Sequence, residues 1–160
     1  MALMRMKVFS GYQKLDGQLA TLGAWTQSVL LLVIRLYWGW SFFLTGRGKL
    51  VNLGKTTEFF ASLDLPLPKI NAMVAGSTEC VGGLLLLLGL GARLVSVPLM
   101  FTMIVAYATA DKEALAALFS DPDKFVSAAP FQFLLASAIV FAFGPGKLAL
   151  DTLWARKSAK

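Results

Sequence analysis

The sequence contains no histidine, a single cysteine and few charged residues. Of its 160 residues, 15% are charged and 57% are hydrophobic, and the mean hydropathy is +0.68. The lack of histidine excludes histidine-ligated haem and histidine acid–base catalysis. Because Cys80 stands alone, one chain cannot form an internal disulfide, a CxxC redox pair or a thiolate-rich metal site. Soluble domains carry about 25% charged residues, so this composition indicates a membrane protein.

The apolar residues gather in four stretches, at about 25–44, 70–90, 94–110 and 128–143. A helix needs about 20 apolar residues to cross a bilayer, with a range of roughly 17–25. The first two stretches fit this length, and the last two lie at its short end. Lipid offers the backbone no hydrogen-bond partner, so each stretch is expected to be a spanning helix. The sequence therefore predicts an all-α integral membrane four-helix bundle over residues 25–151.

The two ends of the chain differ from the bundle in composition. In residues 1–24, apolar side chains recur at spacings of four and three, with polar residues between them. These apolar residues are Val8, Tyr12, Leu15, Leu19 and Leu22. The pattern predicts an amphipathic helix lying on the membrane surface; the alternative is a frayed soluble tail. Residues 152–160 form a basic C-terminal tail.

The basic residues also bear on orientation and partners. Fifteen Lys and Arg against nine Asp and Glu give a net charge of +6. In a four-span topology, the side that holds both termini carries the majority of the basic residues outside the spans, and this side tends to face the cytoplasm. We therefore expect a multi-pass protein of a bacterial-type inner (plasma) membrane with both termini in the cytoplasm. The same bias explains the basic composition without a nucleic-acid partner.

Two charged residues interrupt the apolar stretches. Arg35 lies near the middle of the first stretch, and Glu79 lies near the middle of the second. An unpaired charge at the centre of a bilayer costs about 2.5–3.5 kcal/mol on insertion scales. We therefore expect a buried contact between Arg35 and Glu79. Such a pair either fixes the helix register without doing chemistry or marks a functional site.

The surroundings of these charges suggest a binding pocket. Residues three and four positions apart share a helix face, and both charged faces carry small or aromatic residues. Together with polar residues of the third and fourth stretches, the candidate ligand-binding residues are Arg35, Trp38, Gly39, Lys49, Glu79, Gly83, Tyr107 and Gln132. Aromatic and small residues beside a charge pair favour a pocket for a flat molecule such as a quinone. No metal site and no covalently bound cofactor are expected.

Three short motifs resemble those of DoxX-like membrane proteins. They are Arg35-Leu36 with Gly39, Phe43, Gly46 and Lys49; Glu79-Cys80-Val81-Gly82-Gly83 with Gly89-Leu90-Gly91-Ala92-Arg93; and Phe143-Gly144-Pro145-Gly146-Lys147-Leu148-Ala149-Leu150-Asp151. Their order and spacing extend the resemblance over about residues 30–151. Ala149 departs from the pattern, because the family often has serine at that position.

The resemblance implies a four-helix membrane bundle associated with redox biology. Relatives of this kind include a small subunit of a thiosulfate:quinone oxidoreductase. By the same resemblance, the candidate site positions are Arg35, Gly39, Lys49, Glu79 and Gly83. We expect an integral membrane subunit of an oxidoreductase system that is not catalytic alone. It would bind a quinone or another lipophilic small molecule, or anchor a redox partner.

Two other functions fit the same residues. The first is a non-catalytic membrane scaffold or assembly protein of a larger membrane complex. The second is a small proton-linked carrier, in which Glu79 would titrate during transport. The expected partners are membrane lipids, other membrane or membrane-associated subunits, and a second copy of the chain.

Overall fold

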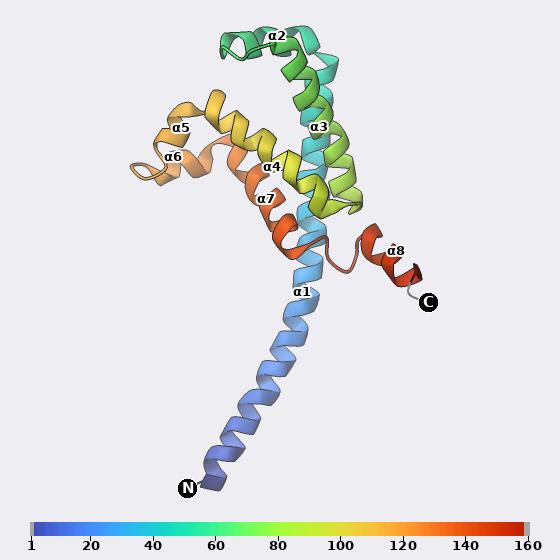
Figure 1. Cartoon of the computed structure of the whole chain (residues 1–160). Coiled ribbons are helices and arrows are strands. Elements are labelled where there is room, and N and C mark those ends of the chain that lie inside the picture. Colours follow the sequence, from blue (N-terminus) through green and yellow to red (C-terminus); the bar gives the residue numbers. More distant parts are fainter. Residues whose placement is uncertain (1, 159–160) are drawn as a thin grey trace.

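The computed structural model describes the backbone of residues 2–158 and the side chains of residues 13, 15–155 and 157. Within this part of the chain every regular element is a helix (Figure 1). The helices are α1 (Ala2–Val51), α2 (Leu53–Ser62), α3 (Pro68–Leu88), α4 (Ala92–Thr109), α5 (Lys112–Ala116), α6 (Pro122–Ser127), α7 (Ala129–Phe143) and α8 (Leu150–Ser158). The long helices lie close to the predicted stretches.

The first helix is much longer than one membrane crossing. α1 has 50 residues, which corresponds to about 75 Å of helix. Its N-terminal part continues the same axis past the end of the bundle (Figure 1). The expected helix at 1–24 is therefore present from Ala2 onward, but it is not a separate helix. The first proline is Pro66, so the sequence offers α1 no strong helix breaker.

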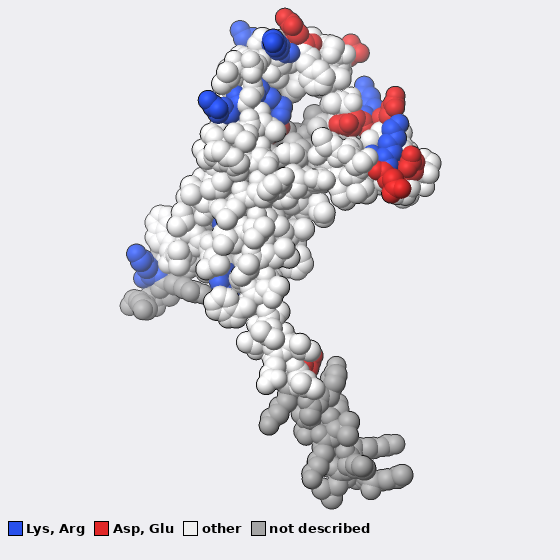
Figure 2. Space-filling model, turned by 180° about the vertical axis from the view of Figure 1, so that it is seen from behind, with Lys and Arg blue, Asp and Glu red and all other residues white. Residues whose placement is uncertain are grey.

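Among the residues that the structure describes, three helices are long and apolar enough to cross a membrane: α1 over residues 15–51, α3 and α4. The fourth predicted span, α7, has 15 residues, about 22 Å of helix against a hydrocarbon core of about 30 Å. Charged side chains gather mainly at the end formed by α2, α5 and α6, and a broad uncharged surface lies below them (Figure 2). The chain is an all-α membrane protein, as predicted, and α7 is the shorter apolar helix of its bundle.

The helices pack as two antiparallel pairs, α1 with α3 and α4 with α7. Glycines seven residues apart bring α1 and α3 into backbone contact, as small residues do in membrane helix pairs. A Cβ added to Gly46 would lie 2.3 Å from the amide nitrogen of Cys80, and one added to Gly83 would lie 2.5 Å from that of Phe43. These contacts fix the register between the two helices.

The two pairs are joined by an apolar core on one side of the bundle. Phe42 of α1 is fully buried and meets Phe133 of α7 edge to face, with ring centroids 4.6 Å apart. Leu86, Leu99 and Val140 complete this core and are also fully buried. Beyond it, the pairs diverge toward the α2 and α5–α6 end (Figure 1). The bundle therefore has a closed end and an open end.

Candidate functional site

At the open end, the carboxylate of Glu79 forms an ion pair with the ammonium of Lys49. Glu79 belongs to α3 and is 2% exposed, whereas the Lys49 side chain of α1 is 29% exposed. A buried carboxylate without a partner would be strongly destabilising, and the Lys49 ammonium supplies the balancing charge for Glu79. The expected Arg35–Glu79 contact is wrong, because Lys49 takes the place of Arg35.

The helix register explains this difference. A Cβ on Gly46 would lie 2.8 Å from the carbonyl carbon of Glu79, so these two residues are level in the α1–α3 pair. Arg35 precedes Gly46 by eleven positions, which is about 16 Å along the helix. The sequence pattern places both charges near mid-depth of their helices. The glycine contacts set a different register, in which Glu79 is level with Gly46 and not with Arg35.

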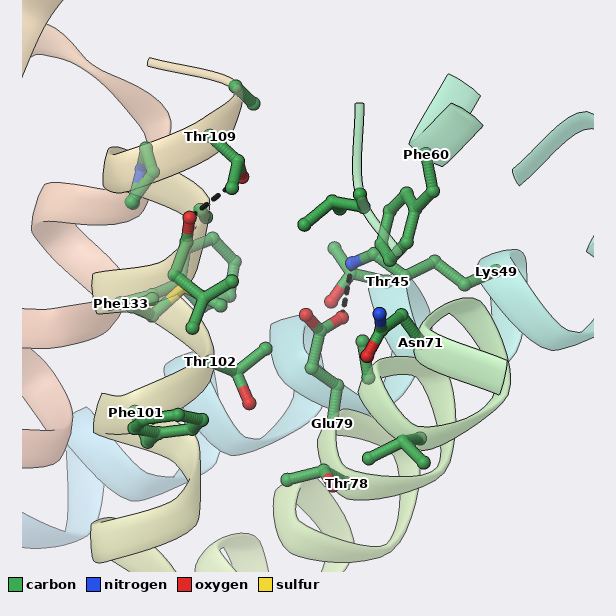
Figure 3. A pocket seen from close by; sticks show the side chains of 18 of the residues that line it. Thr45, Lys49, Phe60, Asn71, Thr78, Glu79, Phe101, Thr102, Thr109 and Phe133 are labelled. Carbon is green, nitrogen blue, oxygen red and sulfur yellow. Dashed lines mark hydrogen bonds and ion pairs between the residues drawn. The ribbon is translucent and has the colours of Figure 1, made fainter. Parts of the chain in front are cut away.

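The ion pair borders a cavity of about 600 Å³ between the two helix pairs (Figure 3). Its walls come from all four long helices and from α2. Most of the side chains that line it are apolar, and they include Phe60, Val74, Phe101, Val105, Ala106 and Phe133. Because Val74 of α3 is 59% exposed and Phe101 of α4 is 66% exposed, the cavity opens between these helices within their apolar length.

Few polar groups face this cavity besides the ion pair. Thr78 and Asn71 lie on the α3 wall beside Glu79, and Thr102 lies opposite on α4 (Figure 3). The Thr102 hydroxyl donates to the carbonyl of Pro98 at 2.9 Å. The side chain of Thr78 has no hydrogen-bond partner within the described part of the chain. The site is a mainly apolar pocket, and its charged lining residues are the ion pair and Asp111.

Arg35 lies at the closed end, where it is 1% exposed. Its Nη2 donates to the carbonyl of Leu148 at 2.9 Å, and its charge interacts with Asp151. The carboxylate of Asp151 in turn accepts from the amides of Gly91 at 2.9 Å and Ala92 at 3.2 Å. Arg35 therefore ties the C-terminal segment to the α3–α4 turn. Its Nε and Nη1 have no partner among the described residues.

The other candidate residues have different surroundings. Gly39 and Gly83 lie at the α1–α3 backbone contact, and Trp38 packs edge to face on Phe133 at 5.0 Å. Tyr107 is 2% exposed and donates to the carbonyl of Phe125 at 2.7 Å. Gln132 is exposed on α7 and does not line the cavity. Of the eight candidates, Lys49 and Glu79 line it together.

Several lining residues were missed by the sequence analysis. Phe101, Val105 and Ala106 share one face of α4 with Thr102 and Thr109, at the helical spacing of three and four. In sequence this face cannot be told from a lipid-facing one, because both are apolar. Thr102 and Thr109 could have identified this face, since hydroxyls in a span tend to face protein rather than lipid.

These features define the class of protein: a small all-α membrane protein with a buried ion pair at the wall of an apolar cavity. The DoxX family model matches residues 30–112, which include Arg35, Lys49 and Glu79. The chain belongs to the DoxX family. It is 33% identical over 104 residues to a protein of Bacillus subtilis (strain 168) named "Putative oxidoreductase CatD", covering 65% of this chain and 69% of that protein. No solved structure matches the chain.

Proposed function

We propose that this protein is a membrane subunit of an oxidoreductase system and binds a quinone or a similar lipophilic small molecule in the cavity. The observation that carries the proposal is the buried Lys49–Glu79 pair at the wall of an apolar cavity that opens between α3 and α4. The name of the Bacillus subtilis relative supports the link to an oxidoreductase. A partner protein would supply the redox centre, since the sequence has no histidine and one cysteine.

The residues present fit a quinone. Small-molecule pockets commonly enclose about 300–1,000 Å³ and combine apolar walls with a few polar groups, as this cavity does. A quinone ring needs hydrogen-bond donors at its oxygens. The Lys49 ammonium has three N–H donors and uses one on Glu79, and the Thr78 hydroxyl has no partner among the described residues. When bound, a quinone would supply electron acceptance or donation.

The chain's own residues would bind and orient the ligand. Lys49 donates to a ligand oxygen while it stays close to Glu79, so the positive charge remains balanced. Glu79 holds Lys49 in place and can accept a proton at its carboxylate from the ligand side. Phe101 and Phe133 line the cavity, and their rings give the ligand an apolar surface to pack against.

Ligand binding can be tested with a matched pair of variants on α4. Ala106 lines the cavity, whereas Ala108, two residues later, is exposed and does not line it. The probe is decylubiquinone, titrated into protein in lipid nanodiscs while tryptophan fluorescence is recorded, because Trp38 contacts Phe133 of the cavity wall. We expect saturable quenching for the wild type and for Ala108→Phe, and at least a tenfold weaker affinity for Ala106→Phe.

The same experiment separates this proposal from its rivals. No saturable binding by the wild type, or equal binding by both phenylalanine variants, would contradict a ligand site in this cavity. A scaffold predicts partner capture in mild detergent that survives Ala106→Phe. A carrier predicts substrate flux in vesicles that is lost in Glu79→Gln.

A further inference from the structure

A regular apolar stripe runs along the free face of α1. From residue 15 to residue 40 its members alternate in steps of four and three, the heptad spacing of coiled coils. They are Leu15, Leu19, Leu22, Thr26, Val29, Val33, Leu36 and Trp40. We name this set the α1 seam. The sequence continues the same spacing toward the N-terminus with Val8 and Tyr12, whose side chains lie outside those that the structure describes.

The α1 seam faces away from the rest of the molecule. α1 buries Leu31, Arg35 and Phe42 against the bundle, and the seam positions lie on the opposite face. All eight seam residues are exposed, with Leu15, Leu19 and Leu22 each more than 60% exposed. Leu15 to Trp40 covers about 39 Å of helix. Nothing in the described part of the chain covers this stripe.

We propose that two copies of this chain pair in parallel through the α1 seam. Two copies inserted in the same orientation are related by a two-fold axis along the membrane normal, so that the same surface of each meets the other. A seven-residue repeat sustained over almost four heptads keeps both seams in contact if the helices wrap in a left-handed coil. The crossing angle of such a pair is about 20°.

The seam is longer than the hydrocarbon core of a bilayer, about 39 Å of helix against about 30 Å. The N-terminal part of α1 extends beyond the bundle (Figure 1), and none of the described α1 residues before Ser28 is buried. Leu15, Leu19 and Leu22 belong to this stretch, and Asp16 and Gln18 are exposed between them, so a straight α1 that crosses the membrane would carry these leucines past the hydrocarbon core. A second copy would cover the leucines there, where burial of apolar surface is favourable.

The area of the seam suits a stable dimer. Its apolar side chains expose on the order of 600 Å² in each chain, so pairing would bury on the order of 1,200 Å² in total, the lower limit of specific interfaces. Thr26 is the one polar member, and its hydroxyl already donates to the carbonyl of Leu22 at 3.0 Å. Pairing would therefore leave this hydroxyl satisfied.

Cysteine cross-linking tests the seam directly. In a Cys80→Ala background, Leu22→Cys places a thiol in the seam, and Ala20→Cys places one on the other side of the same exposed turns. Protein in lipid nanodiscs is oxidised with copper phenanthroline and resolved on a non-reducing gel. We expect Leu22→Cys to form dimers at least ten times faster than Ala20→Cys. Equal rates, or no dimer from Leu22→Cys, would overturn the proposal.

A measurement of the molecular mass provides a second, independent test of pairing. In mild detergent, light scattering should give the mass of two chains for the wild type and for Ala20→Asp. It should give the mass of one chain for Leu19→Asp with Leu22→Asp. A wild type with the mass of one chain would contradict pairing through the α1 seam. Neither arm depends on a cavity ligand, so both are independent of the proposed function.

Discussion

The two ends of the bundle treat a buried charge in different ways. At the closed end, Arg35 is enclosed by the α3–α4 turn and the C-terminal segment, and it binds a backbone carbonyl. At the open end, Glu79 is equally buried, but its partner Lys49 borders a cavity. The closed end uses its charge to hold chain segments together. The open end keeps a charge pair next to free volume, which is why we assign ligand binding to it.

The largest expected effect is the loss of Arg35. Arg35→Ala would remove the hydrogen bond to the Leu148 carbonyl and the charge interaction with Asp151, and it would leave a cavity where a large, fully buried side chain stood, a change that typically costs about 2–5 kcal/mol. Arg47→Ala is the control, because Arg47 is exposed. Thermal unfolding in a fixed detergent should show a large drop for Arg35→Ala and little change for Arg47→Ala. Equal melting temperatures would refute the structural role of the closed end.

A second prediction concerns the turn that encloses Arg35. Gly89 and Gly91 both have positive φ, +70° and +55°, so alanine at either position carries a similar backbone cost of about 1–2 kcal/mol. A Cβ on Gly89 would also lie 2.0 Å from Nη1 of Arg35, whereas one on Gly91 meets nothing within 4 Å.

Gly89→Ala should therefore be less stable than Gly91→Ala by about 1–3 kcal/mol, the usual cost of overpacking. Urea unfolding followed by tryptophan fluorescence would measure the difference. In an Arg35→Ala background the difference between the two alanine variants should shrink to what the contact with Ala149 imposes, because a Cβ on Gly89 would still lie 2.7 Å from Cβ of Ala149. An unchanged difference there would show that Arg35 is not a group that Gly89 accommodates.

The sequence predicted the helices better than their contacts. The stretches 70–90 and 128–143 correspond closely to α3 (Pro68–Leu88) and α7 (Ala129–Phe143), because an apolar run is a local property. The partner of Glu79 depends on how Gly46 and Gly83 slide α1 against α3, and no local pattern reveals that register. The bond between Asp151 and Gly91 joins residues sixty positions apart, so the closed end was missed for the same reason.

The cavity and the length of α1 show two further limits. The cavity arises where the two helix pairs diverge, and its apolar walls look like lipid-facing surface in sequence. The spacing of residues 8–22 predicts an amphipathic helix along the membrane surface, whereas the N-terminal part of α1 continues the axis of the spanning helix (Figure 1). Periodicity identifies an apolar face, whereas the continuity of the helix decides where that face lies.

At the open end, the corresponding change is the loss of Lys49, the partner of Glu79. Lys49→Ala leaves Glu79 without its partner, but the cavity lets water or a ligand reach the carboxylate. We expect a loss of about 1–2 kcal/mol, smaller than for Arg35→Ala, because solvent access reduces the penalty for an unpaired group. Thermal unfolding should rank Arg35→Ala as the more damaging change. The reverse order would mean that the Lys49–Glu79 pair, rather than Arg35, is the main structural tie.

The smallest effect belongs to an exposed ion pair at the rim of the open end, where Nζ of Lys124 lies 2.9 Å from a carboxylate oxygen of Glu113. The hydrogen bond from Lys124, and then its charge, lower the pKa of Glu113 below its usual range. A lowered pKa means that the pair stabilises the fold above the unfolded-state pKa of Glu113, and that this contribution is lost as pH falls through the folded-state pKa. Exposed pairs contribute little, so the α5–α6 end should loosen only slightly in acid.

A carbon-13 NMR titration should place the Glu113 midpoint below that of an unpaired glutamate, and Lys124→Met should raise it. A midpoint unchanged by Lys124→Met would mean that the pair does not persist in solution, whereas the Lys49–Glu79 pair is held by burial.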